Sequence, residues 1–482
     1  MHKTLHASDV LVLTRLFAGE HHQIVVYDPH RTLRQDAPLF YPIFSDLHSL
    51  RQWLDLNTTP PTVFLLNAAA TSLASLFDHP KINTLLQSQP FSTAPYCHQL
   101  ASINNPDTTL RWIFPRTNSH PVHLDLYNAS GWKAKGYRSL SRLAFRLGRA
   151  AYLYTGRLSL HSKTESVFFQ NLATLDYEEL AIFTGTVSTT RKAIVALSRG
   201  GRTRYFVKLP IFQGADALLR NEREQLQQLD GMDWPTLQLP RVHPLARGIA
   251  LENNTPSGAR NSTRWQWQHA QALDEMYTQT QRQMPLGDLQ ALTKIEASLS
   301  QLVTDLAPTP DSTLSQQANR LLVLQLYHWR TLPLEKTWTV ARAHGDFTPW
   351  NMYLGRSGLY LYDWELAQCE LPLLVDAFHF IFQTGILIHR HSWSQLKTQL
   401  AVLRSSDWVQ RWQRRGPLDF DWHLKFYLLF ISTHYLPQYL HQQPLHPQAF
   451  WLMQCWERAL SEWKEIPVAL APEADAATVS AP

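Results

Sequence analysis

The sequence predicts an α+β protein in which a small, mainly β lobe is followed by a larger helical lobe. A further small α/β domain is expected at the N-terminus. Three patterns lead to this prediction: residues 180–209 alternate apolar runs with turn signals, residues 352–362 have the pattern of a hairpin, and the segments after residue 265 have mostly helical periodicity. The chain has 482 residues, of which 44% are hydrophobic, and this is enough for two to four domains with substantial cores.

Residues 1–130 are predicted to form an α/β accessory domain whose role the sequence does not reveal. Short strands are expected at residues 10–13, 24–27, 63–66 and 112–114, and helices at 47–54 and 73–86. The region has no glycine-rich phosphate loop. We therefore expect it to serve substrate recognition, partner binding or scaffolding rather than a second active site.

Residues 131–165 are predicted to form a basic amphipathic linker helix. Residues 132–157 contain no acidic side chain and seven basic ones: Lys133, Lys135, Arg138, Arg142, Arg146, Arg149 and Arg157. The favoured interpretation is a helix that packs Leu140, Leu143 and Leu147 on the following lobe and keeps its arginines in water. Peripheral contact with an anionic membrane ranks second, because each arginine near the surface would contribute about 1 kcal/mol. Nucleic acid is not an expected partner, because the net charge of +5 is modest.

Residues 166–255 are predicted to form the β lobe. Strands are expected at 180–184, 191–197 and 204–209, and a loop rich in small residues separates the first two. In that loop, Gly185, Thr186 and Ser188 would let backbone N–H groups approach phosphate oxygens. Lys208 ends the apolar run of the third strand, where a cation can pair with phosphates if a nearby carboxylate holds it.

The segment after these strands supplies that carboxylate. Residues 215–229 are predicted to form a helix that carries Glu222 and Glu224, and Asp230-Gly231 is its stop signal. Two further strands are expected at 239–242 and 248–252. Residues 253–258 break the pattern, as a hinge between two lobes would.

The most informative stretch is His344-Gly345-Asp346, which Asn351 follows at the fifth position after Asp346 and Asp363 at the twelfth after Asn351. A hairpin with its turn at 355–358 would bring Asn351 and Asp363 together at the ends of adjacent strands. Two oxygen donors there can hold Mg²⁺ against the phosphates of a nucleotide. Asp346 is then free to accept a proton from an attacking hydroxyl.

The pattern HGDFxPxN, with a following strand that ends in Asp-Trp-Glu, resembles the aminoglycoside phosphotransferase and choline kinase family of small-molecule kinases. This resemblance implies a bilobal, protein-kinase-like fold. It also implies that Asp346 is the catalytic base, that Asn351 and Asp363 are the metal ligands, and that His344 supports the loop. The expected cofactors are ATP or GTP together with Mg²⁺.

The resemblance also places the nucleotide. The loop at 185–190 would cover the phosphates, and the family spacing of a glutamate with leucines four and seven residues later selects Glu222 as the partner of Lys208. The adenine ring would lie against backbone groups near Leu251 to Asn253. The acceptor would be a hydroxyl of a small metabolite, a sugar or a glycan precursor, bound by the helices of residues 256–466. The sequence of these helices does not indicate which acceptor they bind.

Asp376 lies in the first turn of a predicted helix. An acidic residue there stabilises the helix dipole by about 0.3–1 kcal/mol. In the family that the motif resembles, an aspartate at this place buttresses the catalytic loop. Its role is expected to be structural in either case.

Three other interpretations compete with this one. A non-catalytic, nucleotide-binding regulatory module is the main alternative, because the phosphate loop has a single glycine. A protein kinase is disfavoured, since the chain has HGD where HRD is expected and no APE-like segment follows Asp363. An aminoglycoside acceptor is disfavoured because acidic residues are sparse in the C-terminal helices, with only Asp419 and Asp421 between residues 418 and 438.

Composition bounds the remaining possibilities. No apolar run reaches the roughly 18–20 residues that span a bilayer, and the N-terminus is a poor signal peptide, so the expected location is the cytoplasm, with the inner face of the membrane as an extension. Cys97, Cys369 and Cys455 are widely separated, which argues against a disulfide framework or a structural zinc site. The oligomeric state is left open, and residues 467–482 are predicted to be a disordered tail.

Overall fold

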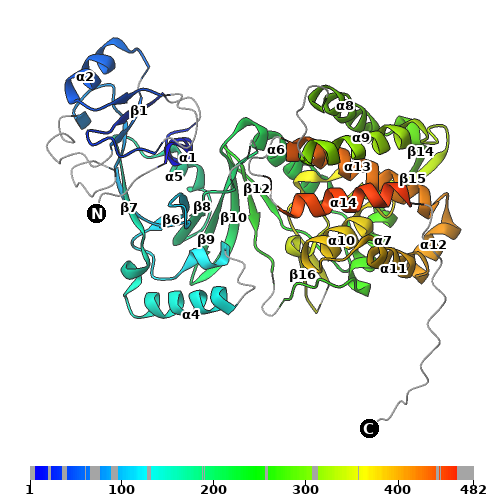
Figure 1. The fold of residues 1–482 in the computed structure, drawn as a ribbon. Helices are drawn as coiled ribbons and strands as arrows, with labels where there is room; N and C mark the ends of the chain where they lie inside the picture. The colour runs from blue at the N-terminus through cyan, green and yellow to red at the C-terminus, as the bar shows by residue number, and fades with distance from the viewer. Residues whose placement is uncertain are drawn as a thin grey trace, which may run out of the picture. The chain divides into compact units, whose positions relative to one another are not determined.

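A computed structural model describes residues 6–19, 23–34, 41–59, 61–65, 76–87, 96–126, 132–186, 188, 190–255, 259–306, 313–356, 358–440, 445 and 447–463. The predicted tail lies outside these residues. The chain forms two compact units (Figure 1). Unit 1 contains Met1–Arg223 and Pro240–Asn253, and unit 2 contains Glu224–Leu239 and Asn254–Pro482. The boundary falls inside helix α6 (Gln213–Leu229), whose residues up to 223 belong to unit 1.

Among the described residues, unit 1 is built on one twelve-stranded sheet with the order β12-β13-β10-β9-β8-β6-β5-β7-β4-β3-β1-β2. The strands are β1 (Ile24–Tyr27), β2 (Ile43–Phe44), β3 (Thr62–Leu65), β4 (Thr84–Gln87), β5 (Tyr96–Asn104), β6 (Leu110–Pro115), β7 (Gly156–Ser162), β8 (Glu179–Phe183), β9 (Lys192–Arg199), β10 (Arg202–Pro210), β12 (Val242–Pro244) and β13 (Ile249–Glu252). Strands β2, β1, β3 and β4 pair in parallel, and the other neighbours pair antiparallel.

The sheet runs without interruption from the predicted accessory domain into the predicted β lobe. Strand β6 pairs with β8, with Trp112 opposite Phe183 and Ile113 opposite Ile182. Successive residues of a strand point to opposite faces. Accordingly, Ile113 belongs to the core that contains residues of α1 (Ala7–Phe17), whereas Trp112 and Phe114 belong to the core on the other face.

The three-strand meander predicted at 180–209 is confirmed, because β8, β9 and β10 pair antiparallel in chain order. The strand predicted at 10–13 is wrong, since these residues lie in helix α1. A four-residue apolar run fits either element, and here Val10, Leu13 and Phe17 follow helical spacing into the core. The prediction of a helix at 73–86 is wrong at its C-terminal end, because Thr84–Gln87 form strand β4, which pairs with β3. Residues 73–75 of that prediction lie outside the described ones.

The basic segment forms a shorter helix than predicted. Helix α4 (Trp132–Arg146) ends well before residue 165, and strand β7 follows at Gly156–Ser162. The buried residues of α4 are Ser141 and Phe145. Leu140, Leu143 and Leu147 are 57%, 52% and 60% exposed, so the interpretation that these leucines pack on the lobe is wrong. Other helices among the described residues of unit 1 include α2 (Leu47–Leu56), α5 (Val167–Leu172), η1 (Val122–Leu126) and η2 (Ala150–Leu153).

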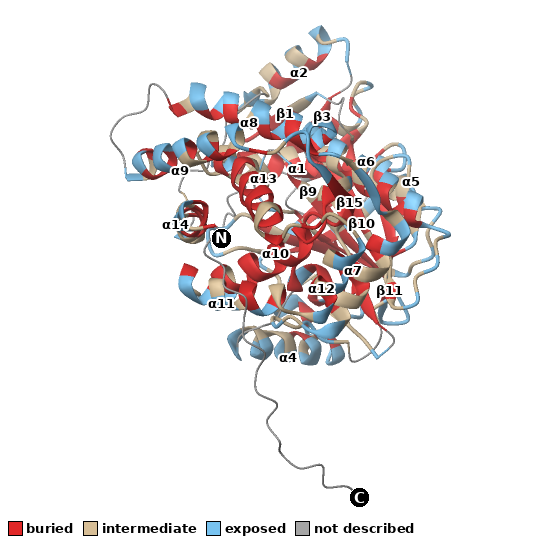
Figure 2. Cartoon of the chain, turned by 90° about the vertical axis from the view of Figure 1, so that its right-hand side faces the viewer, coloured by how far each residue is buried: buried red, intermediate tan, exposed pale blue. Residues whose placement is uncertain are grey.

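Unit 2 is mainly helical. Its helices are α7 (Trp267–Thr280), α8 (Gln290–Leu306), α9 (Thr313–Arg330), α10 (Val375–Gln383), the π-helical turn η6 (Thr384–Ile388), α11 (Trp393–Arg404), α12 (Asp407–Arg415), α13 (Phe420–Leu440) and α14 (Pro447–Ser461), with short turns η3 (Leu286–Asp288), η4 (Pro349–Asn351) and η5 (Trp364–Leu366). Every residue of α10 is buried, and Figure 2 shows α10 and much of α13 in the colour of buried residues. None of the described helices has both the length and the apolarity that crossing a bilayer requires.

Two small sheets complete unit 2. One has the order β11-β17-β16, with β11 (Leu237–Gln238), β17 (Leu359–Leu361) and β16 (Met352–Leu354). The other has the order β14-β15-β18, with β14 (Arg282–Pro285), β15 (Thr337–Ala343) and β18 (Gln368–Pro372). The predicted hairpin is confirmed, because β16 and β17 pair antiparallel with Met352 opposite Leu361. With a mainly β unit 1 and a mainly helical unit 2, the predicted α+β class is confirmed.

Candidate active site

Lys208 and Glu222, the cation and the carboxylate that we expect beside the nucleotide phosphates, are in contact in unit 1. Lys208 lies on β10, and its Nζ donates to Oε1 and Oε2 of Glu222 on α6, at 2.7 Å each. The residues are 7% and 0% exposed. Glu224, the alternative partner, is exposed. A buried charge is tolerated only when it is paired, so the two side chains fix each other in place.

The loop between β8 and β9 is held at its two ends. Gly185 has a φ of +77°, and a Cβ there would lie 2.0 Å from the carbonyl oxygen of Lys192, so no larger residue fits. Near the other end, Nε of Arg191 donates to the carbonyl of Thr184 at 2.8 Å. Thr186 and Ser188 are exposed between these points, and residues 187 and 189 lie outside the described ones. Thr186 and Ser188 are therefore open to solvent between two anchored ends of the loop.

Strand β13, which we expect beside the adenine ring, is hydrogen-bonded to the segments on both sides of it. Leu251 is 3% exposed on β13, which lies between β10 and β12. The N–H of Glu252 donates to the carbonyl of Arg241 at 2.9 Å, and the N–H of Asn253 donates to the carbonyl of Arg204 at 2.8 Å. Neither of these two N–H groups is therefore open to a nucleotide base.

In unit 2, a buried aspartate organises the HGD loop. The carboxylate of Asp376, in the first turn of α10, accepts the N–H of His344 at 2.7 Å and the N–H of Gly345 at 2.9 Å. Burial raises the pKa of the Asp376 carboxyl, and these amide hydrogen bonds oppose that effect. Gly345 has a φ of +81°, and a Cβ there would lie 2.3 Å from the carbonyl oxygen of Leu366. Asp376 thus buttresses the loop.

Both ring nitrogens of His344 are used for positioning. Its Nδ1 accepts the N–H of Asp346 at 3.2 Å, so Nε2 carries the proton and donates to the carbonyl of Tyr362 at 2.8 Å. Tyr362 immediately follows β17. The imidazole therefore links the HGD loop to the hairpin, in keeping with a supporting role.

Asp346 lies at the centre of a hydrogen-bond network. Its Oδ2 accepts from Nδ2 of Asn351 at 2.8 Å, and its Oδ1 lies 3.0 Å from Nε2 of His379 on α10. Burial by itself would raise the pKa of the Asp346 carboxyl. The hydrogen bond and charge of His379 outweigh this effect and hold that pKa below its usual range. Asp346 is therefore ionised at neutral pH, with a side chain that is 23% exposed.

The hairpin brings the two predicted metal ligands to the same end. The N–H of Tyr362 donates to the carbonyl of Asn351 at 2.8 Å, which places Asp363 next to that pair. The amide nitrogen of Asn351 is committed to Asp346, through its carboxylate and its carbonyl, so Oδ1 is the atom left to face a cation. Asp363 and Glu365 offer carboxylate oxygens within 4.8 Å of each other. An all-oxygen donor set fits Mg²⁺.

Two residues of this network were missed by the sequence analysis. His379 is 1% exposed, and the hydroxyl of Tyr427 on α13 lies 3.5 Å from its Nδ1. The sequence did contain an indication of His379: this residue follows Asp376 by three positions, and residues at that spacing share a helix face. Tyr427 carried no signal, since its contact with His379 spans 48 positions.

A third missed residue connects the HGD strand to the second part of α6. Arg342, on β15 just before the HGD loop, is 7% exposed. Its guanidinium donates to the side-chain oxygens of Gln225 and Gln228. Burial lowers the pKa of Arg342. Both contacts lie within unit 2, so they hold the end of α6 against the strand that carries the site.

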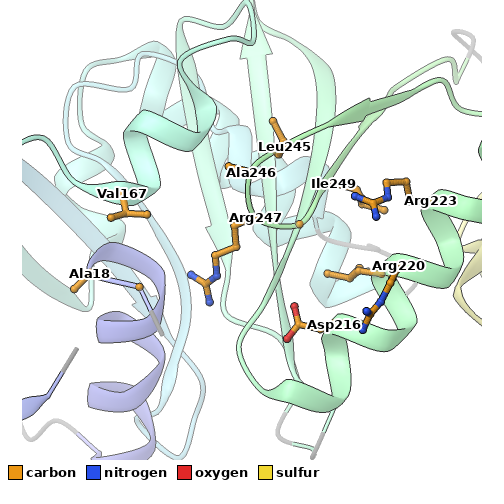
Figure 3. A pocket seen from close by; sticks show the side chains of 12 residues that line it. Ala18, Val167, Asp216, Arg220, Arg223, Leu245, Ala246, Arg247 and Ile249 are labelled. Atoms are coloured by element: carbon orange, nitrogen blue, oxygen red, sulfur yellow. The ribbon is translucent and has the colours of Figure 1, made fainter. Parts of the chain in front are cut away.

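Each unit also has a cavity apart from these side chains. In unit 1, a cavity of about 670 Å³ lies beside α6, and Figure 3 shows Asp216 of α6 and Arg247 of the β12–β13 turn among the side chains that line it. The Arg247 guanidinium donates to the carbonyls of Arg15 and Pro210, which ties that turn to α1 and β10. In unit 2, a cavity of about 470 Å³ is lined by Trp265 and Phe380, among others.

No protein-family model matches the chain, and none of the curated proteins matches it. Among solved structures, the chain is similar to the aminoglycoside phosphotransferase APH(2'')-IIa in a ternary complex with streptomycin and ATP. The identity is 13%, the TM-score is 0.37, and 62% of this chain and 97% of that one are covered. A thermostable mutant of APH(4)-Ia gives 14% identity, a TM-score of 0.37, and coverage of 56% and 91%.

A choline/ethanolamine kinase family protein from Mesorhizobium loti gives 13% identity, a TM-score of 0.33, and coverage of 59% of this chain and 88% of that one. These neighbours belong to the families that the HGD motif resembles. At such TM-scores they carry no argument about the activity of this chain, which depends on its own residues.

Proposed function

We propose that the protein is a small-molecule kinase that transfers the γ-phosphate of ATP or GTP to a hydroxyl group. The observation that carries this proposal is the environment of Asp346. Its carboxylate is ionised, is oriented by Asn351 and His379, and is still partly exposed. A general base must be unprotonated, fixed in direction and within reach of a substrate.

The roles of the other residues follow from the same arrangement. Oδ1 of Asn351 and the carboxylate of Asp363 would hold Mg²⁺, which neutralises charge on the transferring phosphates. Lys208, fixed by Glu222, would bind phosphate oxygens, and the loop with Gly185, Thr186 and Ser188 would cover them. His344 and Asp376 hold the loop and do not take part in proton transfer.

The acceptor is proposed to be a small metabolite, a sugar or a glycan precursor. The acceptor would bind among the helices of unit 2, in roughly residues 265–335 and 376–465, on both sides of the HGD loop in the sequence. Asp419 and Asp421, the acidic residues between 418 and 438, are already engaged: Asp419 with Lys336 and Asp421 with Arg404. A polycationic acceptor would therefore find few open carboxylates in that part of the chain.

Asp346→Asn tests the proposal. We expect the variant to bind nucleotide nearly as well as the wild type, because Asp346 is not a proposed metal ligand. Its turnover, measured as nucleotide consumption across a panel of hydroxylated metabolites, should fall at least roughly a hundredfold, as expected when a general base is lost. Asp407→Asn, at an exposed position in the first turn of α12, is the matched control and should leave turnover unchanged.

Two outcomes would count against the proposal. An undiminished rate in Asp346→Asn would remove this residue as the base. Tight nucleotide binding by the wild type with no turnover on any acceptor, and with hydrolysis that does not depend on Asp346, would favour the regulatory module instead.

A further inference from the structure

Helix α4 presents a line of large apolar side chains to solvent. Trp132 is 79% exposed, and Leu140, Leu143 and Leu147 are 57%, 52% and 60% exposed. Positions 132, 136, 140 and 143 of α4 are three or four residues apart, so they share one helix face. Leu147 directly follows the end of α4 and continues this line, since its N–H donates to the carbonyl of Leu143 at 3.0 Å. The member at 136 is a glycine, and an added Cβ there would meet no atom within 4 Å. We call this line the outer stripe.

The opposite face of α4 is fixed to unit 1. Ser141 and Phe145 are buried, and the ring of Phe145 lies 6.2 Å from that of Phe114 on β6. The hydroxyl of Tyr137 lies 3.4 Å from Nε2 of His123. The helix is therefore held by its inner face, and the outer stripe is displayed on a fixed support.

Positive charge surrounds the outer stripe. Five exposed basic side chains lie along α4 and just beyond it: Lys133, Lys135, Arg142, Arg146 and Arg149. No carboxylate of the described residues forms an ion pair with any of the five. The segment 132–157 has seven basic residues and no acidic one, so the rest of the chain has a net charge of −2 (+5 − 7). The net positive charge of the protein is thus concentrated in residues 132–157.

We propose that α4 docks unit 1 on a bilayer surface that contains anionic lipid, with the helix lying in the plane of the interface. Leucine and tryptophan side chains would enter the boundary between headgroups and acyl chains, while lysines and arginines stay at the level of the phosphates. The fifteen residues of α4 span about 22 Å, which is long enough to lie across several headgroups. The binding of an interfacial helix grows with the apolar area that it buries and with its attraction to anionic lipid, and this segment offers both.

A nucleic-acid partner fits this face less well. Phosphate contacts would satisfy the arginines, but Leu140, Leu143 and Leu147 would then lie against a charged and hydrated backbone. Base readers present polar side chains or aromatic platforms at the centre of their contact surface, whereas the centre here is aliphatic. The docking proposal depends only on α4, and it would stand if the proposed kinase activity failed.

Vesicle flotation of the full-length protein tests the proposal. We expect the wild type to float with vesicles of phosphatidylcholine mixed with phosphatidylglycerol, to stay in solution with phosphatidylcholine alone, and to be released by high salt. Arg142→Gln/Arg146→Gln should reduce partitioning about 25-fold, since about 1 kcal/mol per cation is about fivefold. Leu140→Ser/Leu143→Ser/Leu147→Ser should reduce it at least about tenfold.

Matched controls come from two other exposed helix surfaces. Val323→Ser/Tyr327→Ser removes two large apolar side chains from α9 that are 66% and 63% exposed. Arg411→Gln/Arg414→Gln removes two exposed cations from α12. Both control variants should partition like the wild type. Because all these side chains are exposed, every variant should keep the melting temperature of the wild type, which shows that a loss of flotation is not unfolding.

The proposal would be overturned if the wild type did not float with vesicles that contain phosphatidylglycerol at low salt. It would also be overturned if the leucine variant floated as well as the wild type. Single-stranded RNA is the competing ligand in the same assay. RNA binding that is lost in the arginine variant and kept in the leucine variant, without flotation of the wild type, would assign α4 to nucleic acid.

Discussion

Unit 1 and unit 2 hold their charged site residues in different ways. In unit 1, the Lys208–Glu222 pair is almost fully buried, and each charge depends on the other. In unit 2, Asp346 is partly exposed and is surrounded by hydrogen bonds from Asn351 and His379. The difference indicates that the Lys208–Glu222 pair is part of the stability of unit 1, whereas Asp346 can be changed at a smaller cost to the fold of unit 2.

The largest effect is expected from Lys208→Met, which leaves the Glu222 carboxylate buried without its partner. We expect the free energy of unfolding to fall by about 3–5 kcal/mol, as is typical when one member of a buried pair is removed. Denaturant unfolding measures this change. The double variant Lys208→Met/Glu222→Leu should recover most of the loss, because no uncompensated charge remains. If the Lys208→Met variant were as stable as the wild type, the buried pair would not contribute to the stability of unit 1.

An intermediate effect is expected from Asp363→Ala. The change removes a carboxylate from the hairpin end, so Mg²⁺-dependent nucleotide binding should weaken at least about tenfold, or about 1.4 kcal/mol. Calorimetry with and without Mg²⁺ measures this. Binding in the absence of Mg²⁺ should change little. The melting temperature should fall slightly, because Asp363 has a φ of +66°, a conformation that alanine adopts less readily than aspartate. Unchanged affinity in Mg²⁺ would remove Asp363 from the metal site.

The smallest effect concerns the pH dependence of stability in unit 2. His423 is buried on α13, where its ring stacks on Trp338 with centroids 4.3 Å apart. Burial lowers the pKa of His423 to about 4. Because the unfolded chain binds this proton near pH 6.5 and the folded chain only near 4, the folded state loses stability as the pH falls through that window. The loss is about 1.4 kcal/mol per pH unit.

His423→Gln should lower stability at neutral pH, because the stacking on Trp338 is lost, but its stability should fall less steeply between pH 6.5 and 4. Unfolding curves across this window measure the slope. Identical slopes in the wild type and the variant would show that His423 is not protonated on unfolding.

Local patterns predicted a large part of the candidate site. The hairpin that brings Asn351 beside Asp363 follows from two short apolar runs around a turn, and the meander that ends at Lys208 follows from similar signals. Glu222 was chosen by family spacing, and the structure pairs it with Lys208. The errors arose where a short apolar run fits two elements, as at residues 10–13, which form part of α1.

Other features could not be read from the sequence, because they join positions far apart in the chain. The pairing of β6 with β8 makes one sheet of two predicted regions, and the contact of His379 with Asp346 lowers the pKa of the proposed base. The sequence also could not show which face of α4 is buried. Amphipathic spacing predicted an apolar stripe, but whether that stripe meets the protein or the solvent depends on what packs beside it.

The local elements and the order of the chemical groups follow from the amino-acid sequence, because hydrophobic period, turn residues and motif spacing act over a few positions. The partners of these groups are set by long-range packing: Asp376 under the HGD loop, His379 against Asp346, and Phe145 rather than the leucines on the inner face of α4. These choices depend on shape and desolvation in the packed chain, where a side chain is stabilised or exposed by neighbours that its own segment does not specify.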